Sequence, residues 1–145
     1  MASALFTQEE KKAIVSSIVE AEKNTSGEIQ IHIENQCAIN VLDRAAEIFA
    51  ILKMNKTKLR NGVLFYVAME DHKFAILGDA GINAVVPPDF WDSIKEKMRA
   101  KFKEGSFADG ICEGIYLAGQ QLKKHFPYKA GDKNELSDEI SFGKN

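Results

Sequence analysis

The chain has 145 residues, of which 45% are hydrophobic and 28% are charged. This length suits one ordinary domain with a buried core, and this composition excludes wholesale disorder. The formal net charge is −2, with 19 Lys and Arg against 21 Asp and Glu, so the chain lacks the basic excess of a nucleic-acid-binding protein. No apolar run approaches the roughly 20 residues that span a bilayer. We therefore predict a cytoplasmic protein without a membrane span and favour a monomer.

The first half of the chain predicts two helices with a strand between them. A T-x-x-E capping pattern begins at Thr7 and precedes an apolar stripe, which predicts a helix over residues 7–23. Residues 28–34, EIQIHIE, alternate strictly between polar and apolar side chains. This alternation is typical of a strand with one face on the core and one polar face. Helical spacing of apolar residues predicts a second helix over residues 41–53.

The second half predicts a hairpin followed by two helices. Residues 62–69, GVLFYVAM, are apolar on both faces, as in a central strand covered by helices. The sequence EDHK predicts a turn into a third strand over residues 74–77. A helix is expected from about Asp89, which we interpret as its N-cap, and another over residues 107–126.

This order of elements predicts an α/β fold, a three-layer α/β/α sandwich with a small mixed β-sheet and helices on both faces. A right-handed crossover makes the first two strands parallel, whereas the tight turn makes the third strand antiparallel. We expect the folded domain to occupy residues 1–127. Residues 128–145 form a polar, acidic tail that we expect to be flexible or loosely docked.

The expected strand directions bring three distant segments to one edge of the sheet. Glu28 opens the first strand, Arg60 and Asn61 precede the second, and Asp79 follows the third. Carboxylate, amide and loop carbonyl oxygens are ligands of hard divalent cations, calcium above all and magnesium as the other candidate. Lys58 and Arg60 in the connector would hold a phosphate or another anion beside such a site.

Simpler interpretations of the same residues remain open. Glu28 can be a plain charge at a strand end, and Asp79 can cap the following turn through its own carboxylate. The three histidines lie on three different expected elements and lack zinc-ligand spacing. No nucleophile-elbow, P-loop or dinucleotide motif occurs. The catalytic residues, if the chain has any, are therefore unknown from the sequence.

Several segments of the chain resemble the TPM domain family. They are FTQEEKKAI, TSGEIQIHI, RNGVLFYVAMEDHKFAILGDAGIN and FKEGSFADGICEGI, which together extend over residues 6–126. The NGVLFYVA hairpin is the most specific of them. The resemblance implies an α/β/α sandwich and a divalent cation, usually calcium, held by acidic side chains near the sheet edge. Family members include a thylakoid-lumen acid phosphatase, a photosystem repair factor and a membrane-tethered receptor modulator.

The resemblance also implies roles for particular residues. It makes Asp79, Glu28 and Asp43 metal ligands, although the expected topology puts Asp43 near the opposite edge. It gives Asn61 the role of orienting the loops through hydrogen bonds. Many members are attached to membrane helices or low-complexity segments, so this sequence looks like a stand-alone bacterial version.

Two functions are compatible with these observations. In the first, a bound cation polarises a phosphoryl oxygen and activates water, Arg60 or Lys58 clamps the anion, and a phosphorylated small molecule is hydrolysed weakly. In the second, the domain is a non-catalytic interaction or assembly module for a protein partner, and the ion is only structural. Loss of phosphate-ester turnover on Asp79→Asn would distinguish the first function from the second.

Overall fold

A four-stranded mixed sheet forms the middle layer of the computed structural model, which describes residues 5–128 and 137–143. The strand order is β3-β2-β1-β4, with β1 parallel to both β2 and β4, and β3 antiparallel to β2. The elements in chain order are α1 (Gln8–Glu22), β1 (Glu28–Glu34), α2 (Val41–Ile51), the 3₁₀ helix η2 (Met54–Lys56), β2 (Gly62–Ala68), β3 (Lys73–Gly78), α3 (Ala80–Asn83), α4 (Asp92–Lys103), α5 (Phe107–His125) and β4 (Ser141–Phe142).

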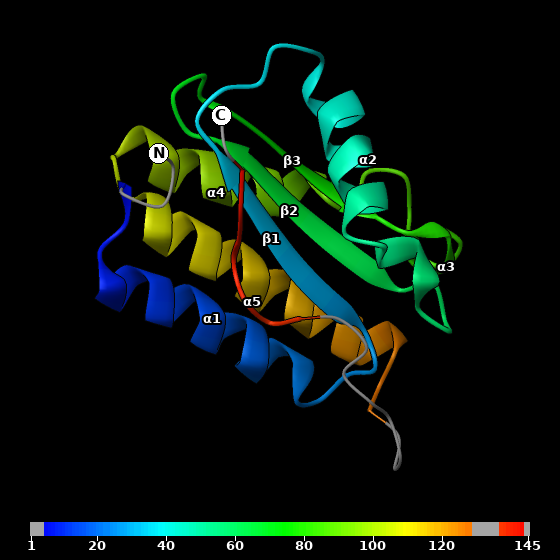
Figure 1. Ribbon diagram of the computed structural model, residues 1–145. Coiled ribbons are helices and arrows are strands. Elements are labelled where there is room, and N and C mark those ends of the chain that lie inside the picture. Colours follow the sequence, from blue (N-terminus) through cyan, green and yellow to red (C-terminus); the bar gives the residue numbers. More distant parts are fainter. Residues whose placement is uncertain (1–4, 129–136, 144–145) are drawn as a thin grey trace.

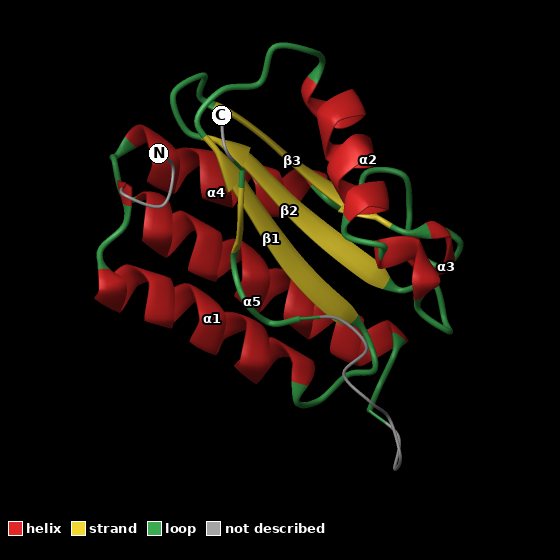
Figure 2. Ribbon diagram, viewed as in Figure 1, coloured by secondary structure: helices red, strands yellow, loops and turns green. Residues whose placement is uncertain are grey.

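Helices cover both faces of this sheet, as the sequence predicted (Figure 1). Helices α1, α4 and α5 lie on one face, and α2 lies on the other (Figure 2). The parallel pairing of β1 with β2 and the antiparallel pairing of β2 with β3 confirm the predicted strand directions. The α/β class and the three layers are therefore confirmed, and the strand β4 is an addition that the sequence did not predict.

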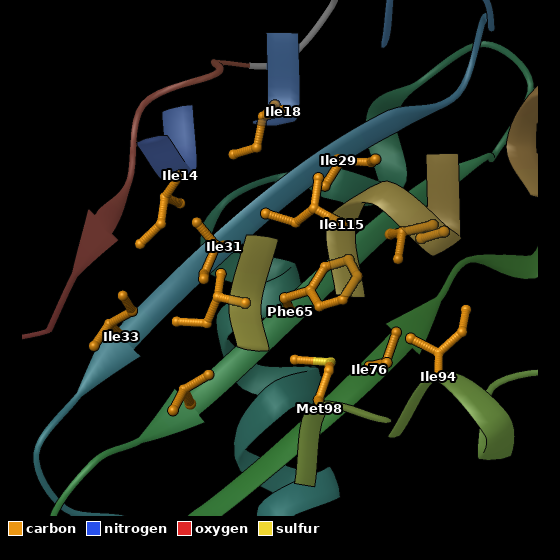
Figure 3. Packing of buried hydrophobic residues seen from close by; sticks show 14 of the residues in the cluster. Ile14, Ile18, Ile29, Ile31, Ile33, Phe65, Ile76, Ile94, Met98 and Ile115 are labelled. Atoms are coloured by element: carbon orange, nitrogen blue, oxygen red, sulfur yellow. The ribbon is translucent and has the colours of Figure 1, made fainter. Parts of the chain in front are cut away.

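The alternation of side chains along the strands divides the interior into two cores. Ile29, Ile31 and Ile33 of β1 pack toward α1 and α5, together with Phe65 of β2 and Ile115 of α5 (Figure 3). The opposite face of β2 and β3 meets α2 in a smaller core. That smaller core consists of Cys37, Ala45, Ile48, Phe49, Met54, Leu64, Tyr66, Ala68 and Ala75.

The two predicted helix starts had different outcomes. The Thr7 side chain accepts from Glu10 N at 3.0 Å, and Glu10 Oε1 accepts from Thr7 N at 2.8 Å, so the capping box is confirmed. The N-cap at Asp89 was wrong, because α4 begins at Asp92. The backbone N–H of Asp92 donates to the Asp89 carbonyl at 3.0 Å, which makes residues 89–92 a turn before the helix.

The polar face of β1 is buried rather than solvated. Glu28, Gln30, His32 and Glu34 alternate with the isoleucines, and all four are between 1% and 7% exposed. The C-terminal segment lies along this strand, where β4 runs beside β1 in Figure 1. Gln30 Nε2 donates to the Ser137 carbonyl at 3.0 Å, and His32 Nδ1 lies 2.7 Å from Ser141 Oγ.

Part of the expected tail is therefore an ordered strand. Ser141 pairs with His32, and Gly143 N donates to the Ile33 carbonyl at 2.8 Å. A strand of two residues has no measurable hydrophobic period, which explains why the sequence did not predict it. The remainder of the expected tail, residues 129–136 and 144–145, lies outside the described residues.

A partly buried carboxyl group, that of Glu22, joins α1 to this C-terminal segment. Glu22 Oε2 accepts from Ile29 N at 2.7 Å. Burial and a hydrogen bond with Asp138 raise the pKa of Glu22 to about 9, although the bond from Ile29 opposes the shift. Glu22 therefore holds its proton near neutral pH, unlike an exposed glutamate.

We expect Glu22→Gln to flatten the pH dependence of stability. The pKa of Glu22 is raised from 4.5 to about 9 on folding, so between these values the native state binds more protons than the unfolded state. Stability should then fall as pH rises through this range, and a permanently neutral Gln should remove that loss. Urea unfolding at about pH 5 and about pH 8 measures the effect.

Glu20→Gln is the matched control, because Glu20 lies on the same helix with an exposed side chain paired to Lys23. Its pH dependence should resemble that of the wild type. Equal slopes for the wild type and Glu22→Gln would contradict a protonated Glu22.

Helices α1 and α5 touch through small residues. A Cβ added at Gly119 would lie 2.7 Å from Ala21 Cβ and 3.2 Å from Ala21 Cα. Gly119→Ala should therefore destabilise the protein by about 1–2 kcal/mol, because overpacking outweighs the helix-propensity gain of about 1 kcal/mol. Thermal or urea unfolding measures this change in the free energy of unfolding.

Gln120→Ala, on the exposed side of α5, is the control and should leave the free energy of unfolding nearly unchanged. Adding Ala21→Gly to Gly119→Ala should recover part of the lost stability. If the effects of the two substitutions on stability simply add, the contact between Ala21 and Gly119 is not the cause of the loss.

Candidate functional site

Three segments meet where β1 and β2 begin and β3 ends. The Cα atoms of Glu28 and Gly62 are register partners, and Asp79 N donates to the Gly62 carbonyl at 2.9 Å. We call this end of the sheet the Gly62 rim, formed by Glu28, Arg60, Asn61, Gly62 and Asp79. The convergence predicted from strand direction is confirmed.

Both rim carboxylates belong to the same face of the sheet. Ile29 and Ile76 face the large core, so alternation places Glu28 and Asp79 on the opposite side, toward α2 and η2. Glu28, Gly62 and Asp79 lie side by side on three neighbouring strands, in a row across the sheet with Gly62 in the middle. Neighbouring strands are about 4.8 Å apart, so the Cα atoms of Glu28 and Asp79 are roughly 10 Å apart. A Cβ at Gly62 would lie 3.2 Å from the Met54 carbonyl oxygen. Glycine therefore allows this close approach of η2, and a larger residue would require η2 to shift by a few tenths of an ångström.

Asp79 is bound by a two-pronged ion pair. Arg60 Nε donates to Asp79 Oδ2 at 2.7 Å, and Arg60 Nη2 donates to Asp79 Oδ1 at 2.8 Å. The Asp79 side chain is 6% exposed, whereas that of Arg60 is 49% exposed. The hydrogen bonds from the guanidinium to Asp79 raise the pKa of Arg60. An exposed cation therefore neutralises a buried anion at the rim.

Asp79 is also a helix cap. Its Oδ1 accepts from Ala80 N at 2.8 Å, and it occupies the N-cap position of α3. The simpler interpretation of Asp79 as a cap is confirmed, and the pair with Arg60 is added to it. A Cβ at Gly81 would lie 2.1 Å from the Leu59 carbonyl oxygen, so the second glycine of GDAGIN lets this turn pack on the Arg60 loop.

Two further polar side chains are buried in the segments that enter the rim. Asn61 Nδ2 donates to Ser26 Oγ at 3.4 Å, which links the loops before β1 and β2. The loop-orienting role of Asn61 itself stays a prediction. Thr57 Oγ1 is buried and has no hydrogen-bond partner within the described part of the chain. Lys58, expected to help hold an anion, is exposed in the same loop.

Asp43 lies at the other end of the sheet. It is an exposed residue in the first turn of α2. The next residue, Arg44, bonds Glu34 at the end of β1. Glu34 is six positions beyond Glu28 along β1, a rise of about 20 Å. Asp43 is therefore not at the Gly62 rim. This agrees with the predicted topology, which put Asp43 near the opposite edge, and differs from the ligand role that the family resemblance implied.

The oxygen atoms of the rim are of the kind that bind a hard cation, but Arg60 already occupies Asp79. Within residues 5–128 and 137–143, no group of three or more His, Cys, Asp or Glu side chains is arranged to hold a metal ion. A cation here would use two carboxylates, Glu28 and Asp79, and complete its shell with neutral oxygens. The Met54 carbonyl is such an oxygen close to Gly62. Arg60 would be its competitor for Asp79.

The opposite rim holds a second buried acid that the sequence analysis did not single out. Glu34, 1% exposed, accepts from Arg44 Nε at 3.1 Å and from the Tyr66 hydroxyl at 2.5 Å, and its Oε1 lies 3.1 Å from His32 Nε2. Burial raises the pKa of Glu34, but the hydrogen bonds from Arg44, Tyr66 and His32 outweigh burial and lower it to about 2. Burial lowers the pKa of His32. The only signal of this network in the sequence was the alternation of polar and apolar residues in EIQIHIE, which places His32 and Glu34 on the same face of β1.

No helix in the described part of the chain has the length and apolar character needed to cross a bilayer. None of the curated proteins compared with the chain matches it. Several chains of solved structures do match it. The NMR structure of the BA42 protein from the psychrophilic bacterium Bizionia argentinensis is 53% identical, covers 95% of each chain and superposes with a TM-score of 0.90.

The second structure supports the fold alone. It is the solution NMR structure of the N-terminal domain of a protein from P. gingivalis, with 17% identity and a TM-score of 0.68 over 85% of this chain and 79% of that one. The sequence profile of the TPM domain matches residues 2–121, which is most of the chain. The resemblance found in the sequence is confirmed: the chain belongs to the TPM domain family.

Proposed function

We propose that the Gly62 rim binds a divalent cation, calcium in the first place, through Asp79 and Glu28. The main support for this proposal is that the two buried carboxylates lie in one row and on one face of the sheet, on either side of Gly62. Arg60 is the counter-ion that the incoming cation displaces from Asp79. Asn61 holds the two loops in place rather than binding the ion directly.

The burial of the two partners favours this exchange. A carboxylate that is 6% exposed requires a positive partner, because an unpaired buried charge is costly. Its present partner, Arg60, is half-exposed and can return its guanidinium to water at little cost. A divalent ion offers twice the charge and additional coordination to Glu28 and to neutral oxygens. The Asp79–Arg60 pair is thus the resting state of an exchangeable cation site.

A phosphatase would need an anion clamp as well as an ion. A divalent cation, when bound, supplies polarisation of a phosphoryl oxygen. In the resting state, Asp79 uses Nε and Nη2 of Arg60, one of the two edges through which a guanidinium can bind a phosphate. Release from Asp79 would free the guanidinium for an anion, in the same loop as the exposed Lys58. Weak phosphomonoesterase activity is therefore a corollary of the exchange, and binding does not depend on it.

The alternative is a non-catalytic module in which the ion only braces the loops. The capping of α3 by Asp79 and the Asn61–Ser26 contact favour it, because both are ways of fixing loop geometry. A protein partner would then recognise the braced loops. A cytoplasmic location stays a prediction under either function.

Calcium titration of ¹⁵N-labelled protein, followed by amide shifts, tests binding. Saturable shifts should gather at residues 26–29, 57–63 and 78–82. Asp79→Asn should weaken binding at least about tenfold, since it removes one of two charged ligands. Arg60→Ala should tighten binding, because it removes the competitor for Asp79.

Asp43→Asn is the matched control, an equal loss of charge at the opposite end of the sheet. It should leave the calcium affinity unchanged. A flat titration, or shifts that centre on Asp43 and disappear in that variant, would refute the rim site. Weaker binding in Arg60→Ala would show that Arg60 supports the site rather than competes for it.

Turnover of p-nitrophenyl phosphate tests the catalytic corollary. If the rim hydrolyses phosphate esters, calcium or magnesium should stimulate a weak activity that Asp79→Asn removes and Asp43→Asn preserves. Arg60→Ala should then lose activity while it gains calcium affinity, since Arg60 serves the anion. Calcium binding without turnover would identify the non-catalytic module.

A further inference from the structure

A cavity of about 250 Å³ opens beside the β2–β3 hairpin, at the end of β2 that is far from the Gly62 rim. Its apolar lining includes Phe74 of β3, Phe102 of α4 and Phe107 at the start of α5. The Phe74 and Phe102 rings meet edge to face with centroids 5.0 Å apart, and the Phe102 and Phe107 centroids are 5.5 Å apart. All three rings pack on the large core but remain partly accessible, so the apolar surface is preformed.

Positive side chains surround these rings. Arg99 lies over Phe74, with the guanidinium carbon 5.4 Å from the ring centroid. Lys103, one helical turn further on, also lines the cavity, as does Lys73 of the hairpin, whose Nζ donates to the Cys37 carbonyl at 3.4 Å. No Asp or Glu belongs to the lining within the described residues.

Two acids near the cavity have partners of their own. Glu96 is exposed and bonds only Nη1 of Arg99, so Nε and Nη2 of Arg99 are not used by this pair. Asp71 of the hairpin accepts from Cys37 N at 2.7 Å. The cavity therefore combines an aromatic surface with a lining whose charged side chains are basic, a combination that favours a ligand with an apolar body and an anionic head.

We propose that this cavity binds a small organic carboxylate whose alkyl or aryl body covers the phenylalanines. At about 30 Å³ for each water-sized group, the volume of 250 Å³ holds about eight such groups. That size fits a medium-chain or aryl carboxylate and is too small for a helix or a folded partner. Arg99 and Lys103 bind the carboxylate, and Phe74 with its neighbours binds the body.

Octanoate is the probe, with octan-1-ol and octylammonium as neutral and cationic analogues of the same length. Octanoate should give saturable amide shifts at residues 67–74 and 99–107 in ¹⁵N-labelled protein. Octan-1-ol should bind at least about tenfold more weakly, since it lacks the charge-assisted bonds. Octylammonium should give no saturable shifts there.

The variant Arg99→Gln/Lys103→Gln removes two of the cations. It should weaken octanoate binding about tenfold and leave octan-1-ol binding unchanged, because the apolar lining is intact. Lys97→Gln is the control, an exposed cation on the same helix outside this lining. Thermal unfolding of each variant checks that the fold is retained.

Three outcomes would overturn the proposal. One is the absence of saturable shifts with octanoate. Another is equal affinity for octanoate and octan-1-ol, which would make the cavity merely apolar. The third is equal weakening by Lys97→Gln and the double variant, which would show a general charge effect. Inorganic phosphate should not compete with octanoate, since it has no apolar body.

Discussion

Parallel pairing of β1 with β2 is the constraint on which the rest of the structure depends. Because the crossover through α2 returns the chain to the same end of the sheet, both strands begin at the Gly62 rim. The hairpin then brings the end of β3 back to that rim. Glu28, Asn61 and Asp79 are thus gathered by chain direction, although as many as 51 positions separate them. The same constraint sends Asp43 to the other end.

The buried polar face of β1 explains why the two rims differ. Four polar side chains on one strand face are expensive to bury without partners. At the Glu34 end, Arg44, Tyr66 and His32 supply hydrogen bonds within the fold, and β4 lies alongside. That network is satisfied and offers nothing to an incoming ion. At the Gly62 rim the charge of Asp79 is balanced from outside by a half-exposed arginine, so exchange with a solvent cation is feasible there.

The sequence predicted those features that local patterns determine. The capping box at Thr7, the alternation of β1 and the apolar run of β2 carry their own signals, and each gave the correct element. Strand direction followed from connection length, and it correctly placed Glu28 near Asp79 across 51 positions. These predictions required only the period of the hydrophobic pattern and the handedness of a crossover.

Features that depend on side-chain partners could not be predicted in this way. The pair between Arg60 and Asp79 requires the turn of α3 to pack on the Arg60 loop, which only Gly81 permits. The partners of Glu34 come from three elements, and no spacing in the sequence connects them. The strand β4 is too short to show a period. Burial raises the pKa of Glu22, and the hydrogen bond with Asp138 that adds to this shift joins residues far apart in the sequence.

The Gly62 rim and the cavity beside the β2–β3 hairpin lie at opposite ends of β2. Gly62 begins the strand, and Val67 and Ala68 at its other end line the cavity. Leu64 and Phe65 between them are fully buried, one in each core. Coupling between sites requires an element with two arrangements that both ligands bias. A central strand packed on both faces provides a single arrangement, so calcium at the rim and a carboxylate at the hairpin should bind independently of each other.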